Sequence, residues 1–256
     1  MTATLISSLL SCSELTEGPA VILLGGPYVV TSGIRREVPE GSKRLLVFTA
    51  LSTRRVDRRQ VAGALWPCGS DQRAIGNLRS ALWRLKGAGI DLIDSDNVSL
   101  GLRTGTVVDM RIVSDWAARL IDGSADLADL RSVHWPADAV ELLPGWYDDW
   151  IIFERERIRQ RLLHALEALS RRLIAVGRHA DAVDAAISAV SIDPLRESAS
   201  RILIEAHLAE DNIVEGRRAY NRYSDTLHRE LGIAPSQQLT AMVRAASESR
   251  LAAISS

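Results

Sequence analysis

The pattern of apolar and polar positions divides the chain into a mixed first part and a helical second part. Within residues 20–38, short apolar runs rich in β-branched residues are broken by Gly25-Gly26-Pro27 and Gly33, which is typical of short strands joined by tight turns. From Asp109 onward the apolar spacing is helical almost without interruption. We therefore expect a multidomain chain, with an α+β domain followed by an all-α domain.

Two helices are predicted after the strands. Ser42 is placed to cap the first, and the apolar residues within 45–51 leave it almost no polar face, so we expect it at the centre of its domain. Asp57 is placed to cap a second helix, which Pro67 ends. The pattern thus predicts a buried helix followed by a short amphipathic one.

A third helix, from a cap at Asp71 to a stop at Gly87, has two distinct faces. Its apolar face carries Ala74, Ile75, Leu78, Leu82 and Leu85. Its opposite face carries Arg73, Gly76, Asn77, Ser80, Trp83 and Arg84. Arginine can bond guanine, asparagine can bond adenine and serine can bond either, so this face suits the major groove of DNA. The solvated face of an ordinary amphipathic helix accounts for this pattern equally well.

The segment that follows favours the DNA-binding interpretation. Residues 90–102 alternate apolar and polar positions about a turn at 94–97, which predicts a β-hairpin. Helix, helix and hairpin in this order are typical of a winged helix-turn-helix. We expect Asn97 at the tip of this wing and Arg103 at its base to contact DNA, although the acids Asp94 and Asp96 argue against a wing that relies on charge.

Charge is distributed unevenly along the chain. The whole sequence has 31 basic and 32 acidic residues, which gives no hint of a polyanionic partner. Residues 42–90, however, have ten basic and two acidic residues, a net charge of +8, whereas residues 106–256 have a net charge of −5. Because neutralising phosphates needs local charge, the first segment is a candidate for nucleic-acid binding.

The helical part contains an internal repeat. Residues 177–190 align with residues 211–224 at an offset of 34 residues, which is the tetratricopeptide period. The first copy has the expected Gly177, Ala182, Ala189 and Pro194, and the second keeps Gly216, Tyr220 and Tyr223. Helix pairs of this kind stack into surfaces that bind proteins or dimerise. An unrelated helical bundle is the alternative.

Several classes of site and location are excluded or not indicated. Cys12 and Cys68 have no paired spacing, so we expect no disulfide, no metal site and a reducing cytoplasm. No apolar run approaches the ~20 residues that cross a bilayer, so no membrane partner is expected. No cofactor motif stands out.

An enzyme is the first rival interpretation, and the sequence does not support it. The five histidines form no HExxH pair. Asp148 and Asp149, between Trp146 and Trp150, suggest a sugar site, but consecutive carboxylates point apart, and we expect them to cap the following helix. We therefore predict no catalytic residues.

Taken in order, a set of segments resembles the Streptomyces antibiotic regulatory protein family. The resemblance covers residues 20–245. The segments that carry it are 55–67, 77–85, Val108-Asp109, Leu143-Pro-Gly-Trp-Tyr-Asp-Asp-Trp150, 153–157 and Glu230-Leu-Gly-Ile-Ala-Pro235. Members of this family join a response-regulator type winged helix to a bacterial transcriptional activation domain.

The resemblance implies a transcriptional activator of a biosynthetic, secondary-metabolite gene cluster. It implies a homodimer, at least on DNA, bound to direct repeats of double-stranded DNA whose spacing is near one helical turn, and contact with RNA polymerase holoenzyme. It makes residues 73–86 the recognition helix, with Arg73, Asn77, Ser80 and Arg84 toward bases or nearby phosphates. Arg79, Lys86 and Arg103 are the candidates for contacts to the DNA backbone. The expected location is cytoplasmic and nucleoid-associated.

The expected organisation is a flexible leader at 1–19, a winged-helix domain at 20–105 and a tetratricopeptide-like activation domain at 106–256. The sequence has no GK[ST] loop, so we expect the small form of the family. We expect Trp83 to pack beneath the wing or against the helical domain. The second rival is a repeat scaffold for protein interactions whose winged helix no longer binds DNA.

Overall fold

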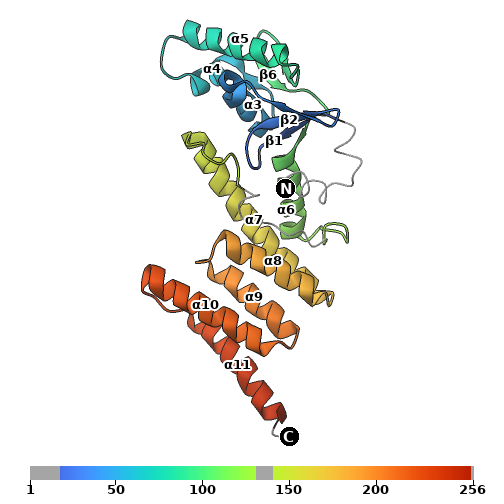
Figure 1. Cartoon of the computed structure of the whole chain (residues 1–256), viewed down its shortest axis with the longest axis vertical. Helices are drawn as coiled ribbons and strands as arrows, with labels where there is room; N and C mark the ends of the chain where they lie inside the picture. Colours follow the sequence, from blue (N-terminus) through green and yellow to red (C-terminus); the bar gives the residue numbers. More distant parts are fainter. Residues whose placement is uncertain (1–17, 131–140, 255–256) are drawn as a thin grey trace. The chain divides into compact units, whose positions relative to one another are not determined.

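The computed structural model describes residues 18–130 and 141–254 and divides the chain into two compact units (Figure 1). Unit 1 comprises the described residues up to Val113 together with Glu141–Ile151, and unit 2 comprises the rest. This division differs from the predicted boundary between residues 105 and 106. Most of the predicted leader lies outside the described residues, and the first strand begins at Ala20, where order was expected.

Unit 1 contains two small sheets. The first has the strand order β3-β2-β1-β7, in which β1 and β7 are parallel and the other neighbours antiparallel. Its strands are β1 (Ala20–Ile22), β2 (Tyr28–Thr31), β3 (Ile34–Glu37) and β7 (Val107–Val108). The second sheet is antiparallel with the order β4-β6-β5, formed by β4 (Val56–Asp57), β5 (Ile93–Ser95) and β6 (Ser99–Leu102). β5 and β6 form the predicted hairpin, the wing.

Along the chain, α3 (Glu40–Leu51) lies between β3 and β4, and α4 (Arg58–Leu65) and α5 (Asp71–Gly87) lie between β4 and β5. α3 is the predicted core helix, since Leu45, Leu46 and Val47 are fully buried. Its predicted cap is wrong, because the helix begins at Glu40 and Ser42 lies inside it. The Ser42 hydroxyl instead donates a hydrogen bond of 2.9 Å to the Ala81 carbonyl of α5 and so joins the two helices.

The caps of α4 and α5 fix where these helices begin. The Asp57 carboxylate accepts the amide protons of Arg59 and Gln60, which confirms the predicted cap of α4. For α5 the prediction was off by one residue, because the Ser70 hydroxyl is the cap and Asp71 is the first helical residue. The negative charge of Asp71 in the first turn still interacts favourably with the helix dipole.

A segment expected in the helical domain belongs to unit 1. Residues Glu141–Ile151 fold onto its first sheet and α3: Leu142 forms a β-bridge with Leu24, and the Trp150 ring packs edge-on against Phe48 at 5.4 Å. Asp148 forms an ion pair with Arg44, so its side chain joins segments instead of serving only the following helix. The tryptophan-rich segment of the family resemblance therefore anchors unit 1.

Asp109 joins the first sheet to the start of α6 (Asp109–Asp122). Its carboxylate is fully buried and accepts the amide protons of Leu23, Leu24 and Met110 at 2.9, 2.8 and 2.7 Å. Burial raises the pKa of Asp109 to about 6, although these hydrogen bonds favour the charged form. A single carboxylate thus satisfies three backbone donors in the core.

Unit 2 is a stack of helices, seen in Figure 1 from yellow to red. Its helices are most of α7 (Asp149–Ala175), then α8 (His179–Ile192), α9 (Glu197–Ala209), α10 (Ile213–Leu231) and α11 (Gln237–Ile254), with the second part of α6. α8, α9, α10 and α11 share one hydrophobic core. The expected pairing of an α+β winged helix with a tetratricopeptide-like domain is confirmed.

The 34-residue repeat is visible in the backbone. Gly177 before α8 and Asp211 before α10 occupy equivalent positions, and both have left-handed φ angles, 76° and 57°. Ala182 and Gly216 are also equivalent, and both are buried. A Cβ at Gly216 would lie 3.3 Å from the Leu208 side chain, so a small residue here lets α10 pack closely on α9.

Candidate nucleic-acid interface

The outward face of α5 presents most of the polar side chains that the sequence predicted. Arg73 and Ser80 are exposed, and Asn77 is half-buried. Arg79 and Lys86, the predicted backbone contacts on this helix, are also exposed. Among the described residues, Arg73, Arg79 and Lys86 have no ion pair. Their charges are therefore available to a partner.

Arg84, one of the predicted base-reading residues, is engaged within unit 1. Its guanidinium donates a hydrogen bond of 2.9 Å to the Gly41 carbonyl in the first turn of α3, and the side chain is half-buried there. A guanidinium held against a neighbouring helix is not free to enter a groove. The helical wheel placed Arg84 on the outer face because a wheel contains no information about which neighbour a long side chain reaches.

The side chain of Arg55 holds the wing in place. Arg55 directly precedes β4, the strand that pairs with β6 of the wing. Its guanidinium forms ion pairs with Asp94 and, at 2.7 Å, with Asp96, and it donates to the Ser99 hydroxyl at 2.9 Å. The Asp96 carboxylate also accepts the amide protons of Val98 and Ser99 across the hairpin turn. These backbone hydrogen bonds lower the pKa of Asp96 to about 2, so it is charged at neutral pH.

The acids of the wing are thus paired within the fold. Asp94 and Asp96 share the one guanidinium of Arg55, which balances one of their two charges and so reduces their repulsion of a phosphate backbone. Asn97 lies exposed at the turn, as expected. Arg103 differs from the expectation: it donates to both carboxylate oxygens of Asp91 at 3.0 Å, so it is already engaged at the base of the wing.

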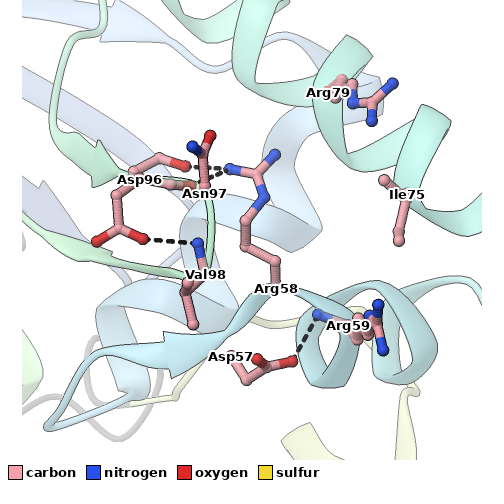
Figure 2. Close-up of a pocket in the computed structure, with 9 residues that line it drawn as sticks. Asp57, Arg58, Arg59, Ile75, Arg79, Asp96, Asn97 and Val98 are labelled. Carbon is pink, nitrogen blue, oxygen red and sulfur yellow. Dashed lines mark hydrogen bonds between the residues drawn. The ribbon is translucent and has the colours of Figure 1, made fainter.

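A cavity of about 590 Å³ lies between the start of α4, one face of α5 and the tip of the wing (Figure 2). Three guanidinium groups line it, those of Arg58, Arg59 and Arg79. The two acids that line it have roles inside the fold, since Asp57 caps α4 and Asp96 closes the turn of the wing. The cavity is therefore positive where it opens to solvent.

Arg58 and Arg59 were not among the predicted contacts. Figure 2 shows the Arg58 side chain extending to the tip of the wing, where it donates to the Asp96 carbonyl at 3.1 Å and to the Ser95 hydroxyl. Arg59 has no ion pair among the described residues. The signal that could have found them is the pair of arginines directly after the Asp57 cap, in the first turn of α4, where the positive end of the helix dipole adds to their charge.

Trp83 also differs from the expectation. Its side chain is 76% exposed, so its predicted packing beneath the wing is wrong. It lies on α5 one turn after Ser80 and Arg79. An exposed tryptophan beside two polar groups on a helix face is a group that a partner can cover.

The described residues offer little that would support other chemistry. Within residues 18–130 and 141–254, no group of three or more histidine, cysteine, aspartate or glutamate side chains is placed to hold a metal ion. None of the described helices is long and apolar enough to cross a membrane. Cys12 lies outside the described residues.

Comparison with known proteins places these features in a family context. Residues 123–246 match the family model of the bacterial transcriptional activator domain. Over 190 residues, 70% of this chain, the sequence is 27% identical to Regulatory protein AfsR from Streptomyces griseus, and the match spans 19% of that protein. The chain therefore covers about a fifth of the length of this curated relative.

A solved structure shows a similar fold. The structure titled Mycobacterium tuberculosis EmbR in complex with low affinity phosphopeptide matches with a TM-score of 0.63 and 20% sequence identity. The match covers 90% of this chain and 65% of that one. It supports the succession of a winged helix and a helical repeat domain.

Proposed function

We propose that this chain is a transcriptional regulator of the Streptomyces antibiotic regulatory protein family, which its similarity to the activator-domain model and to Regulatory protein AfsR supports. Unit 1 then binds double-stranded DNA sequence-specifically, and the chain activates transcription. α5 lies in the major groove, and the wing follows the adjacent backbone. The observation that carries the proposal is the cavity between α4, α5 and the wing, lined by Arg58, Arg59 and Arg79. A phosphate backbone is the partner that needs several positive groups at the edge of a groove-reading helix.

The side chains divide into two roles. Arg73, Asn77 and Ser80 face the bases or the nearest phosphates, because they lie on the outer face of α5 and their donors match base edges. Arg59, Arg79, Lys86 and the wing residue Asn97 contact the backbone. Arg84 and Arg103 are left out of the contact set, since both are engaged within unit 1.

The helical unit supplies the contacts that convert binding into activation. We propose that two copies bind direct repeats near a promoter, with unit 2 joining the protomers and contacting RNA polymerase holoenzyme. Support comes from the activator-domain match over residues 123–246 and from the repeat architecture, whose surfaces suit protein partners. The genes controlled belong to a biosynthetic, secondary-metabolite cluster, and the protein acts on the nucleoid in the cytoplasm.

The direct test is a protection footprint of the purified protein on the promoters that flank its own gene, with and without RNA polymerase holoenzyme. Two protected direct repeats, extended cooperatively by polymerase, are the expected result. Protection that blocks polymerase would identify a repressor instead. No protection even at low salt would favour the repeat scaffold that has lost DNA binding.

Salt dependence and two variants test the contact set. The affinity for DNA should fall steeply with salt, with a slope of about −0.9 per neutralised phosphate. Arg79→Ala should weaken binding to all sequences alike and lower that slope by about one, whereas Arg73→Ala should cost about 1–3 kcal/mol and relax the base preference. Arg218→Ala, an exposed arginine of unit 2, is the matched control. Equal affinity in all three variants contradicts the proposed orientation of α5.

A further inference from the structure

A second cavity, of about 290 Å³, lies between α10 and α11 in unit 2. Each helix contributes one arginine to it, Arg217 from α10 and Arg244 from α11, and the lining contains no acidic residue. Nothing in the proposed contact with DNA uses these residues. The cavity is a separate basic groove in a segment, residues 106–256, whose net charge is −5.

Several arginines of the neighbouring helices are paired with acids, whereas the two arginines of the groove are not. Arginines of α7 to α10 that pair with an acid three or four positions away are Arg157, Arg159, Arg171, Arg201 and Arg218. Arg217 and Arg244 are exposed and have no ion pair among the described residues. Arg161, Arg172 and Arg222 also have no ion pair among the described residues, but Arg217 and Arg244 both line this groove. Two unpaired guanidinium groups in a single groove favour an anionic group.

The base of the groove is partly apolar and held in position. Val243 is almost fully buried, and the Tyr220 hydroxyl lies 2.9 Å from the Thr240 hydroxyl, which joins α10 to α11. A ligand that contacts both the two arginines and the apolar floor of the groove must carry negative charge and apolar surface together. Inorganic phosphate has only the first, whereas an acidic peptide with apolar residues has both.

We propose that this groove, defined by Arg217, Tyr220, Val243 and Arg244, binds an acidic segment of a partner protein. Carboxylates of the segment pair with the two guanidinium groups, and an apolar side chain covers Tyr220 and Val243. A protein partner is favoured over DNA because only two cations face the groove, and its floor offers apolar surface that a phosphate backbone does not use.

The test uses the full chain and a fluorescein-labelled peptide of alternating glutamate and leucine, with a glutamine-for-glutamate peptide as the neutral probe. Fluorescence anisotropy should show binding of the acidic peptide alone. The double variant Arg217→Gln/Arg244→Gln should weaken it about tenfold, and Arg217→Lys/Arg244→Lys should keep most of the affinity. Arg222→Gln, an exposed arginine of α10 outside the groove, is the control, with less than a twofold effect. Equal losses in the double variant and the control would overturn the proposal.

Three further readouts exclude other binding sites and other ligands. A benzophenone group on the peptide should cross-link to α10 or α11, and cross-links confined to α4, α5 and the wing would place the acidic peptide on the DNA-binding surface and overturn the proposal. Inorganic phosphate at the peptide's working concentration should not displace it, and displacement would reduce the groove to a small-anion site. Duplex DNA affinity should be unchanged in the double variant, whereas a parallel loss would make the groove a DNA contact. Because DNA binding is measured separately, this proposal can fail while the proposed function stands.

Discussion

Each unit of this protein buries a carboxylate, and the two carboxylates are stabilised by different partners. Asp109 of unit 1 is fully buried, and its hydrogen-bond donors are backbone amides, with no cation beside it among the described residues. Glu167 of unit 2 is 5% exposed and pairs with Arg196 at 2.7 Å, with the Ser198 hydroxyl at 2.6 Å.

The two carboxylates join different kinds of segments in their units. Asp109 joins a strand end to a helix start and holds unit 1 together at one point. Glu167 lies on α7, and besides Arg171 on the same helix its partners lie on α9 or just before it. Its ion pair with Arg196 therefore reinforces packing that the helical repeat already provides. Unit 1 should therefore depend more on its carboxylate, and on the protonation of that carboxylate, than unit 2 does.

The largest expected effect is that of Asp109→Ala. Removing the carboxylate leaves three buried amides without an acceptor, each costing about 1–3 kcal/mol, so unit 1 should lose at least about 3 kcal/mol of stability. Hydrogen–deuterium exchange of the peptides covering β1 and β2 should rise steeply while those from α8 to α10 stay protected. Unchanged exchange in β1 would mean that water replaces the carboxylate and that the junction does not depend on it.

Glu167→Ala tests the other side of the comparison. It leaves the Arg196 guanidinium and the Ser198 hydroxyl without their acceptor, but Arg196 retains a hydrogen bond of 2.9 Å to Gln160 and its side chain is 19% exposed. We expect the free energy of unfolding, measured with urea, to fall by about 2–3 kcal/mol. Glu167→Gln, which keeps an acceptor, is the control and should lose less. A loss in Glu167→Ala greater than that in Asp109→Ala would reverse the comparison.

The pH dependence of stability separates the two carboxylates most clearly. Burial raises the pKa of Asp109 to about 6, above its unfolded value, so its protonated form stabilises unit 1 at low pH and that contribution is lost as the pH rises through 6. Relative to Asp109→Asn, the wild type should lose about 2 kcal/mol between about pH 4.5 and 7.

Thermal unfolding of the wild type and Asp109→Asn across this pH range measures the effect, because the difference cancels the groups that both proteins share. A difference that does not change with pH would show that the three amide hydrogen bonds outweigh burial and keep Asp109 charged.

The sequence predicted the elements and their order better than it predicted the contacts between them. Apolar periodicity and turn residues located the strands, the core helix, the wing and the 34-residue repeat, because these depend on neighbours along the chain. It could not place Glu141–Ile151 in unit 1, since that depends on a β-bridge to Leu24 and the packing of Trp150 on Phe48, both more than a hundred residues apart in sequence.

The candidate site shows the same division. The helical wheel correctly placed Arg73 and Ser80 on an exposed face of α5. It also placed Arg84 there, and the wing pattern placed Arg103 at the base of the wing, but neither pattern could show that Arg84 reaches the Gly41 carbonyl and Arg103 reaches Asp91. The pairing of Arg55 with the acids of the wing was invisible for the same reason, since those acids lie about forty positions away.

The smallest predicted effect on stability concerns two arginines of α5, one that is engaged within the fold and one that is free. Arg84→Ala removes the donor that reaches Gly41 on α3, so unit 1 should lose about 1 kcal/mol in urea unfolding. Arg73→Ala, on the same helix with an exposed guanidinium, should leave stability unchanged within about 0.5 kcal/mol. DNA binding should show the opposite order, because the free arginine of α5 is the one that faces the partner and the engaged one supports the fold. If the Arg84→Ala variant kept the stability of the wild type but lost base preference, the Arg84 guanidinium of the wild type would leave Gly41 when DNA binds. Arg84 would then be a base-reading residue, as the sequence predicted.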